Sequence, residues 1–161
     1  MPENRRTDGL FPEQSVLHNM TIAALERYTR RCVIDPSQER QAASQLVKTM
    51  SIRTPSLQQR IAVLSGGNQQ KVIMARWLLK DDLKVLIVDE PTRGIDIGAK
   101  VEIYQLLREM AGRGLAMIVI SSEMPELLDL CNRIYVMKNG RFTAELSGND
   151  NTQENLLASA I

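Results

Sequence analysis

The chain has 161 residues, of which 43% are hydrophobic, and its formal net charge is +1 at pH 7. This length and apolar content fit one globular domain with a buried core. The near-neutral charge gives no overall attraction for nucleic acid or anionic lipid. Two distant cysteines and a single histidine, His18, indicate neither a disulfide framework nor a zinc site, and favour a reduced setting. No apolar run approaches the roughly 20 residues that cross a bilayer, so membrane association requires a partner.

The first third of the chain is predicted to be helical, and a further helix follows after a break. Apolar residues recur at helical spacing over residues 15–28, and Asp35 before Pro36 predicts a capped helix that runs to about Met50. Thr54 and Pro55 break this pattern. A third helix is expected from residue 67 or 68 to about residue 80.

The second half alternates between strands and helices. Strands are expected at residues 85–88, 116–121 and 133–137, with helices at 98–111 and 125–130. This alternation predicts an α/β fold with βαβ crossovers and a mainly parallel sheet. The pair Asn139-Gly140 predicts a hairpin to an antiparallel strand at 141–146, and residues 152–160 a terminal helix. The change from a helical pattern to alternating strands and helices divides the chain into residues 1–80 and 81–161.

The segment LSGGNQQK, residues 64–71, places Ser65, Gly66 and Gly67 at the mouth of a predicted helix. Free backbone N–H groups and the positive end of the helix dipole attract an anion at such a point. Taken alone, the segment also fits a simple turn that opens a helix. Gln69, with its two neighbours Gln70 and Lys71, either adds polar contacts or solvates the first turn, and we prefer the second interpretation.

The segment VLIVDE, residues 85–90, is an apolar strand that ends in two carboxylates. Asp89 is suited to Mg²⁺, directly or through water, and Glu90 to polarising an attacking water. An ordinary buried strand with acidic residues at its end is the alternative, but the order of the two segments favours phosphate chemistry. Asp96, in the PTRGID turn that follows, either touches a neighbouring site or caps the next helix. No G-x-x-x-x-G-K-[ST] loop occurs in the sequence.

These two segments, with PENRRTDGL at residues 2–10 and SSEMPE at 121–126, resemble the second nucleotide-binding domain of the tandem ATPases of bacterial monosaccharide importers. The resemblance covers essentially the whole chain and names the ribose, galactose, xylose and arabinose type of ATP-binding cassette (ABC) ATPase. It implies a P-loop NTPase-like fold with a helical subdomain, in which the N-terminal Walker A part is missing. The chain then corresponds to the C-terminal portion of the second cassette, as a truncated or split gene product.

The resemblance also implies roles for individual residues. Residues 65–69 would be the nucleotide-binding signature motif, which consists of Ser65, Gly66, Gly67, Asn68 and Gln69. The first three of these would contact the γ-phosphate of ATP held by the opposing cassette. Asp89 would be the Walker B carboxylate, holding Mg²⁺ through water, Glu90 the catalytic base and Asp96 the D-loop aspartate. Two positions depart from the general pattern. Glu3 stands where a Q-loop glutamine is usual and is a further candidate Mg²⁺ ligand, and Ser122 stands where the switch histidine is usual.

The function implied is an ATP-binding subunit, or a fragment of one, that couples the binding and hydrolysis of Mg²⁺-ATP to carbohydrate import. The alternative is a non-catalytic cassette that donates its signature motif or docks on a permease without hydrolysis. The implied partners are an N-terminal cassette, the transmembrane permease and, indirectly, a periplasmic sugar-binding protein, at the cytoplasmic face of the inner membrane. A cassette that works on ribosomes or DNA is disfavoured because the chain lacks a basic arm, so no nucleic acid partner is expected.

Overall fold

The computed structural model describes residues 1–2 and 5–160. It divides into two compact units, Met1–Ile118 and Val119–Ile161, each with its own packing. The α/β class with a helical subdomain is confirmed. The division predicted from the sequence, into residues 1–80 and 81–161, separates the predicted helical and signature part from the predicted Walker B part. It stays a proposal. No helix within the described residues is long and apolar enough to cross a membrane.

The first predicted helix is shorter than expected. Helix α1 (Val16–Thr21) passes into a 3₁₀ helix, η2 (Ile22–Tyr28), with a break at Ala24, where φ is −135°. The hydroxyl of Thr21 lies 2.9 Å from the carbonyl oxygen of Leu17 and 2.6 Å from a carboxylate oxygen of the buried Glu39. A hydroxyl that bonds back to the preceding turn bends a helix, which accounts for the change of geometry here.

A small hairpin, which was not predicted from the sequence, lies between the first two predicted helices. Strands β1 (Thr29–Arg30) and β2 (Val33–Ile34) pair antiparallel. The turn residues Arg31 and Cys32 have φ of 48° and 64°, the left-handed conformation that two-residue hairpins require. Neither is a glycine, asparagine or aspartate, so the usual signal for such a turn was missing from the sequence. Cys32 is exposed.

Helix α2 (Pro36–Thr49) begins and ends close to its predicted bounds. Asp35 caps it by accepting the backbone N–H groups of Ser37 and Gln38 at 2.9 and 3.2 Å. The first N–H groups of a helix have no partner within the helix, so proline, which lacks an N–H, is favoured at the first helical position. The pair Asp35-Pro36 is therefore a local signal that predicted this helix start correctly.

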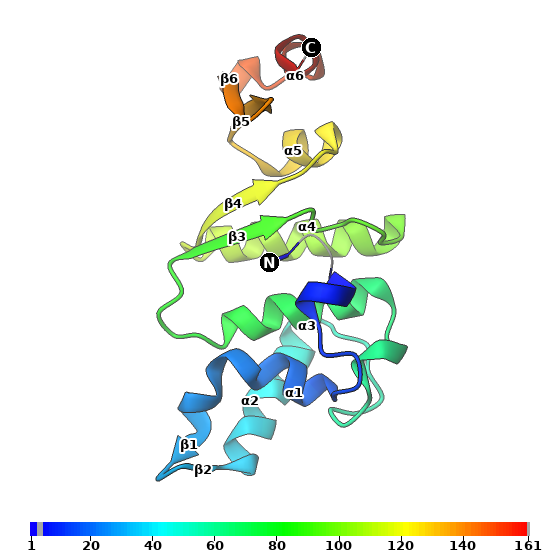
Figure 1. Cartoon of the computed structure of the whole chain (residues 1–161), viewed down its shortest axis with the longest axis vertical. Coiled ribbons are helices and arrows are strands. Elements are labelled where there is room, and N and C mark those ends of the chain that lie inside the picture. The colour runs from blue at the N-terminus through cyan, green and yellow to red at the C-terminus, as the bar shows by residue number, and fades with distance from the viewer. Residues whose placement is uncertain (3–4, 161) are drawn as a thin grey trace. The chain divides into compact units, whose positions relative to one another are not determined.

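Helix α3 (Gly66–Leu78) follows a short 3₁₀ turn, η3 (Ile61–Val63), and lies between α1 and α4 (Figure 1). Its Arg76 is buried and donates to the carbonyl oxygens of Asn19 at 2.6 Å and Gly9 at 2.8 Å. Gly9 ends a five-residue π turn, η1 (Arg5–Gly9), and the guanidinium also lies 5.9 Å from the ring centre of Phe11. This one side chain therefore fastens the amino-terminal segment and α1 to α3.

Strand β3 (Val85–Asp89) and strand β4 (Ala116–Ile120) are hydrogen-bonded neighbours joined through helix α4 (Ile97–Gly112). Leu86 and Val88 are buried, whereas Val85 and Ile87 are about half exposed, as expected for a strand with one covered face. The βαβ order and the ends of all three elements agree with the sequence prediction to within one residue.

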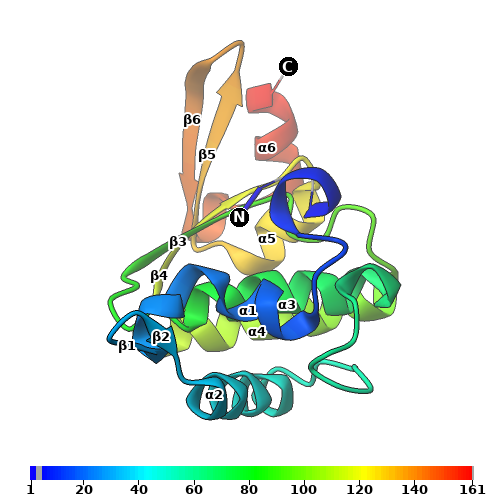
Figure 2. The same cartoon turned by 60° about the horizontal axis from the view of Figure 1, so that its bottom comes forward.

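The second unit contains helix α5 (Met124–Leu130), the hairpin of β5 (Arg133–Lys138) and β6 (Arg141–Ser147), a 3₁₀ turn η4 (Gly148–Asp150) and helix α6 (Gln153–Ala160). Figure 2 shows α6 beside this hairpin. Asn139 and Gly140 have φ of 49° and 74°, which confirms the predicted turn. The unit's small core joins both strands and α6; it consists of Ile134, Val136, Leu146 and Leu156.

Replacing Arg76 with methionine should lower the free energy of unfolding by about 3 kcal/mol, because it leaves buried carbonyl groups without a donor. Urea unfolding followed by circular dichroism measures the loss. The matched control is Arg40→Met on the exposed side of α2, which should change stability by less than about 0.5 kcal/mol. Equal effects of the two substitutions would contradict the role assigned to Arg76.

Candidate functional site

The start of α3 presents the features of an anion-binding loop. Ser65 is the N-cap residue, has an extended backbone and is exposed. Its side chain makes no capping hydrogen bond to the helix. The N–H groups of the first turn therefore lack the side-chain acceptor that closes most helix starts, and a bound anion would satisfy them.

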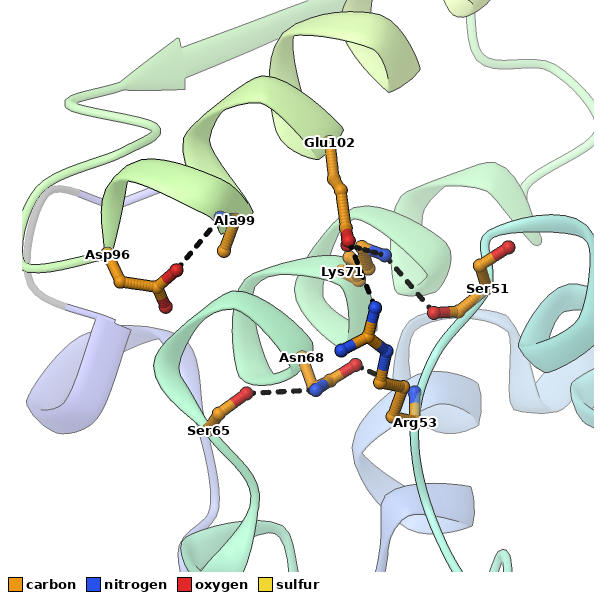
Figure 3. Close-up of polar contacts among 8 residues, drawn as sticks. All are labelled: Ser51, Arg53, Ser65, Asn68, Lys71, Asp96, Ala99 and Glu102. Carbon is orange, nitrogen blue, oxygen red and sulfur yellow. Dashed lines mark hydrogen bonds and ion pairs between the residues drawn. The ribbon is translucent and has the colours of Figure 1, made fainter.

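The side chain of Asn68 links this loop to the segment after α2 (Figure 3). Its Oδ1 accepts the backbone N–H of Arg53 at 2.7 Å, and its Nδ2 donates to Oγ of Ser65 at 2.9 Å. The Ser65 hydroxyl is thus held by a neighbour on its own helix rather than by the helix backbone.

The three residues after Asn68 are buried, so our preferred interpretation, that they solvate the first turn, was wrong. Gln69 is 5%, Gln70 3% and Lys71 3% exposed. The amide of Gln69 donates to the carbonyl oxygens of Leu64 at 3.0 Å and Ile61 at 3.3 Å. Gln69 therefore holds the turn that leads into the loop, and this contact accounts for its burial.

Lys71 forms an ion pair between α3 and α4. Its Nζ lies 2.8 Å from a carboxylate oxygen of Glu102 and donates to the carbonyl oxygen of Ser51 at 3.1 Å. The guanidinium of Arg53 approaches the other carboxylate oxygen at 3.3 Å. The hydrogen bond from Lys71 holds the pKa of Glu102 below its ordinary value. Sequence reasoning missed Glu102 because no local pattern relates residues 53, 71 and 102.

A close contact brings the loop next to the turn that contains Asp96. A Cβ atom placed on Gly67 would lie 2.6 Å from Cβ of Ala99, so only glycine fits there. Asp96 caps α4 by accepting the N–H of Ala99 at 2.9 Å. Of the two interpretations left open for Asp96, the capping one is therefore observed, and contact with a neighbouring site stays a prediction.

The two carboxylates lie at the end of β3. Asp89 is its last residue, and Glu90, also half-buried, follows with φ of 45°. A glutamate in the left-handed region is uncommon, and such strained positions cluster at functional sites. No group of three metal-ligating side chains occurs among the described residues. Mg²⁺ takes one or two carboxylates and completes its shell with water and phosphate oxygens, so this pair fits that mode.

The remaining two candidates lie elsewhere. Ser122 belongs to the second unit, where it is exposed between β4 and α5. Glu3 lies outside the described residues. The structure thus brings together the loop at residues 65–69 and Asp96 within the first unit.

Comparisons with known proteins identify the family of the chain. The family model described as "ABC transporter" matches residues 2–93. The arabinose import ATP-binding protein AraG of Rhizobium meliloti is 46% identical over 160 residues, and the ribose import ATP-binding protein RbsA 1 of Rubrobacter xylanophilus is 47% identical over 159. The xylose import ATP-binding protein XylG of Geobacillus kaustophilus is 44% identical over 158. The matches cover 98–99% of this chain but only 31–32% of each relative, so the chain spans about a third of their length.

Solved structures show the same fold at lower identity. A nucleotide-free ATP-binding cassette from an ABC transporter superposes with a TM-score of 0.75 at 22% identity, over 91% of this chain and 60% of that one. A dimeric cassette in a post-hydrolysis state with ADP and Pi gives 0.70 at 24% identity, over 86% and 58%.

Replacing Gly67 with alanine should destabilise the chain by about 1–3 kcal/mol, because the new methyl group overlaps Ala99. The double variant Gly67→Ala/Ala99→Gly should recover part of this loss in a thermal melt. Gly112→Ala, at the end of the helix α4 that carries Ala99, is the matched control. A Cβ atom at residue 112 would meet nothing within 4 Å. Alanine stabilises a helix relative to glycine by up to about 1 kcal/mol, so this variant should not lose stability. Failure of Ala99→Gly to rescue would refute the close contact as the cause.

The ion pair of Lys71 and Glu102 should make stability depend on pH. The folded-state pKa of Glu102 is depressed, so the stabilisation is present above the ordinary value of 4.5 and is lost as the pH falls through the lower folded value. Glu102→Gln should therefore melt at a lower temperature at neutral pH and show a flatter decline in acid. Glu109→Gln, exposed on the same helix, should retain the parent profile; identical profiles for both variants would count against this assignment.

Proposed function

Because the chain belongs to the ATP-binding cassette family of ABC transporters, we propose that it is the C-terminal part of the second cassette of a tandem ATPase that powers sugar import. The observation that carries the proposal is the loop at residues 65–67, which exposes Ser65, starts α3 without a side-chain cap and packs its buried Gly67 against the helix that Asp96 caps. The relatives that match nearly the whole chain, named for arabinose, ribose and xylose import, support the substrate class.

In this role Ser65 and the N–H groups of Gly66 and Gly67 bind the γ-phosphate of ATP that is held on the opposing cassette. The free N–H groups and the helix dipole supply the attraction, and the exposure of Ser65 leaves it accessible across a dimer interface. Asp96, on the neighbouring turn, faces the same interface.

Asp89 and Glu90 serve the nucleotide of this cassette itself. Asp89, with water, would hold the Mg²⁺ of bound Mg²⁺-ATP, which would supply neutralisation of phosphate charge, and Glu90 would polarise the attacking water. Glu3 occupies the Q-loop position as a further Mg²⁺ ligand, and Ser122 the switch position. Because the 161 residues contain no G-x-x-x-x-G-K-[ST] loop, the β- and γ-phosphates need a cradle from another polypeptide segment.

The second candidate function is a non-catalytic cassette, whose signature loop completes the opposing site while ATP is not hydrolysed at its own site. The partners are the same in both cases: an N-terminal cassette, the permease and, through it, a sugar-binding protein, at the cytoplasmic face of the inner membrane.

The proposed function is tested by grafting residues 1–161 in place of the matching third of arabinose import protein AraG and measuring arabinose uptake and ATP turnover. We expect the chimera to support both, and Ser65→Asp to reduce them by roughly ten- to a thousandfold, because a negative charge replaces a phosphate-binding donor. Aspartate is a favoured N-cap, so α3 should form normally. Ser37→Asp, at the exposed start of α2, is the matched control and should leave uptake unchanged.

Glu90→Gln separates the two candidate functions. Loss of turnover at this site by about 10² to 10⁴ with retained nucleotide binding is expected if this site hydrolyses ATP, whereas unchanged turnover would favour the non-catalytic cassette. The chain by itself should not hydrolyse Mg²⁺-ATP. If Ser65→Asp leaves uptake by a properly folded chimera unchanged, the phosphate-binding role of the loop is contradicted, and the loop is a simple turn that opens a helix.

A further inference from the structure

We propose that Asn68 is a positioning residue, which orients the hydroxyl of Ser65 so that its proton is available to a phosphate oxygen, and this inference rests on the proposed function of the loop. On the sequence alone Asn68 was expected to contact the nucleotide itself. In the structure both ends of its amide are engaged within the chain, at 2.7 and 2.9 Å. Asn68 therefore acts through Ser65.

The orientation of the Asn68 amide follows from its partner on the far side. A backbone N–H can only donate, so the group 2.7 Å from the nitrogen of Arg53 must be the amide oxygen, Oδ1. This leaves Nδ2, which can only donate, facing Oγ of Ser65 at 2.9 Å. The usual ambiguity between the two ends of an asparagine side chain is removed by this contact.

The polarity of the Ser65 hydroxyl follows in turn. A hydroxyl has one proton and two lone pairs, and here one lone pair accepts from Asn68. The proton must then point away from Asn68. The side chain makes no capping hydrogen bond to α3 and is exposed, so the proton is left for an acceptor outside the helix.

Buried contacts hold the segment that orients Asn68. Lys71 donates to the carbonyl oxygen of Ser51 at 3.1 Å, and the N–H of the buried Ile52 donates to Val47 at 2.9 Å. These two bonds fix the backbone immediately before the N–H of Arg53. The guanidinium of Arg53 is largely exposed, with 81% of its side chain accessible, so its ion pair with Glu102 adds little. The backbone N–H of Arg53, rather than its side chain, therefore orients the amide of Asn68.

A double-mutant cycle in the chimera described above, which retains all 161 residues, tests this inference. Ser65→Ala removes the donor, and Asn68→Ala removes the group that orients it; each should reduce ATP turnover about tenfold or more, in the manner of a lost phosphate-binding donor. If Asn68 acts through Ser65, the double variant should match Ser65→Ala within about twofold, since non-additivity is the mark of coupled residues. The melting temperature of each variant reports separately on any structural role.

Asn68→Asp provides a sharper test of polarity. One carboxylate oxygen can still accept the N–H of Arg53, while the other accepts from the Ser65 hydroxyl and draws its proton away from the phosphate. Turnover should fall at least as far as with Ser65→Ala, and the melting temperature should stay close to that of the parent. The same exchange at the exposed Asn149 controls for the added charge and should have no effect.

The outcomes separate the two levels of the proposal. A Ser65→Ala variant with parental turnover would overturn the proposed function of the loop and this inference with it. A harmful Ser65→Ala whose effect simply multiplies with that of Asn68→Ala would overturn the inference alone, and would assign Asn68 a direct nucleotide contact. An Asn68→Asp variant as active as the parent would likewise overturn it.

Discussion

The approach of α3 to α4 at Gly67 and Ala99 is the constraint on which the first unit depends. Helix α3 is buried along most of its length, and only its N-cap residue Ser65 is exposed at its start. A side chain at residue 67 would separate the two helices at that point. With glycine there, α4, which Asp96 caps, lies against the uncapped start of α3. The position of the candidate phosphate-binding loop is thus set by packing between α3 and α4. Because protein interiors are close-packed, the loop has little room to shift.

Two buried cations on α3 extend this constraint. Lys71 and Arg76 lose their water contacts on folding, and oxygen atoms of other segments replace the lost water as hydrogen-bond acceptors. For Lys71 these belong to Ser51 and Glu102, and for Arg76 they are carbonyl groups near the amino terminus. Desolvation lowers the pKa of Arg76, yet a guanidinium stays charged in proteins, so its acceptors are obligatory. Such contacts add less net stability than apolar packing but specify one arrangement of partners.

Features whose cause is local were predictable from the sequence. The capped start at Asp35, the hairpin turn at Asn139 and the carboxylates at the end of β3 each depend on a few consecutive residues. The βαβ order and the position of Ser65 at a helix start followed for the same reason. What escaped prediction depends on distant partners or on tertiary packing: the ion pair of Lys71 with Glu102, the burial of residues 69–71, and the left-handed turn at residues 31–32, which lacks the usual residue types.

The hairpin of β1 and β2 has a practical consequence for following this protein in solution. Its tip exposes Cys32, whereas Cys131 is half-buried and burial raises the pKa of its thiol, with a further contribution from Glu126. Thiolate is the reactive form of cysteine, so a maleimide dye at neutral pH modifies Cys32 and largely spares Cys131. The native chain therefore carries one addressable attachment point on its helical region, and single-label fluorescence needs no engineered cysteine.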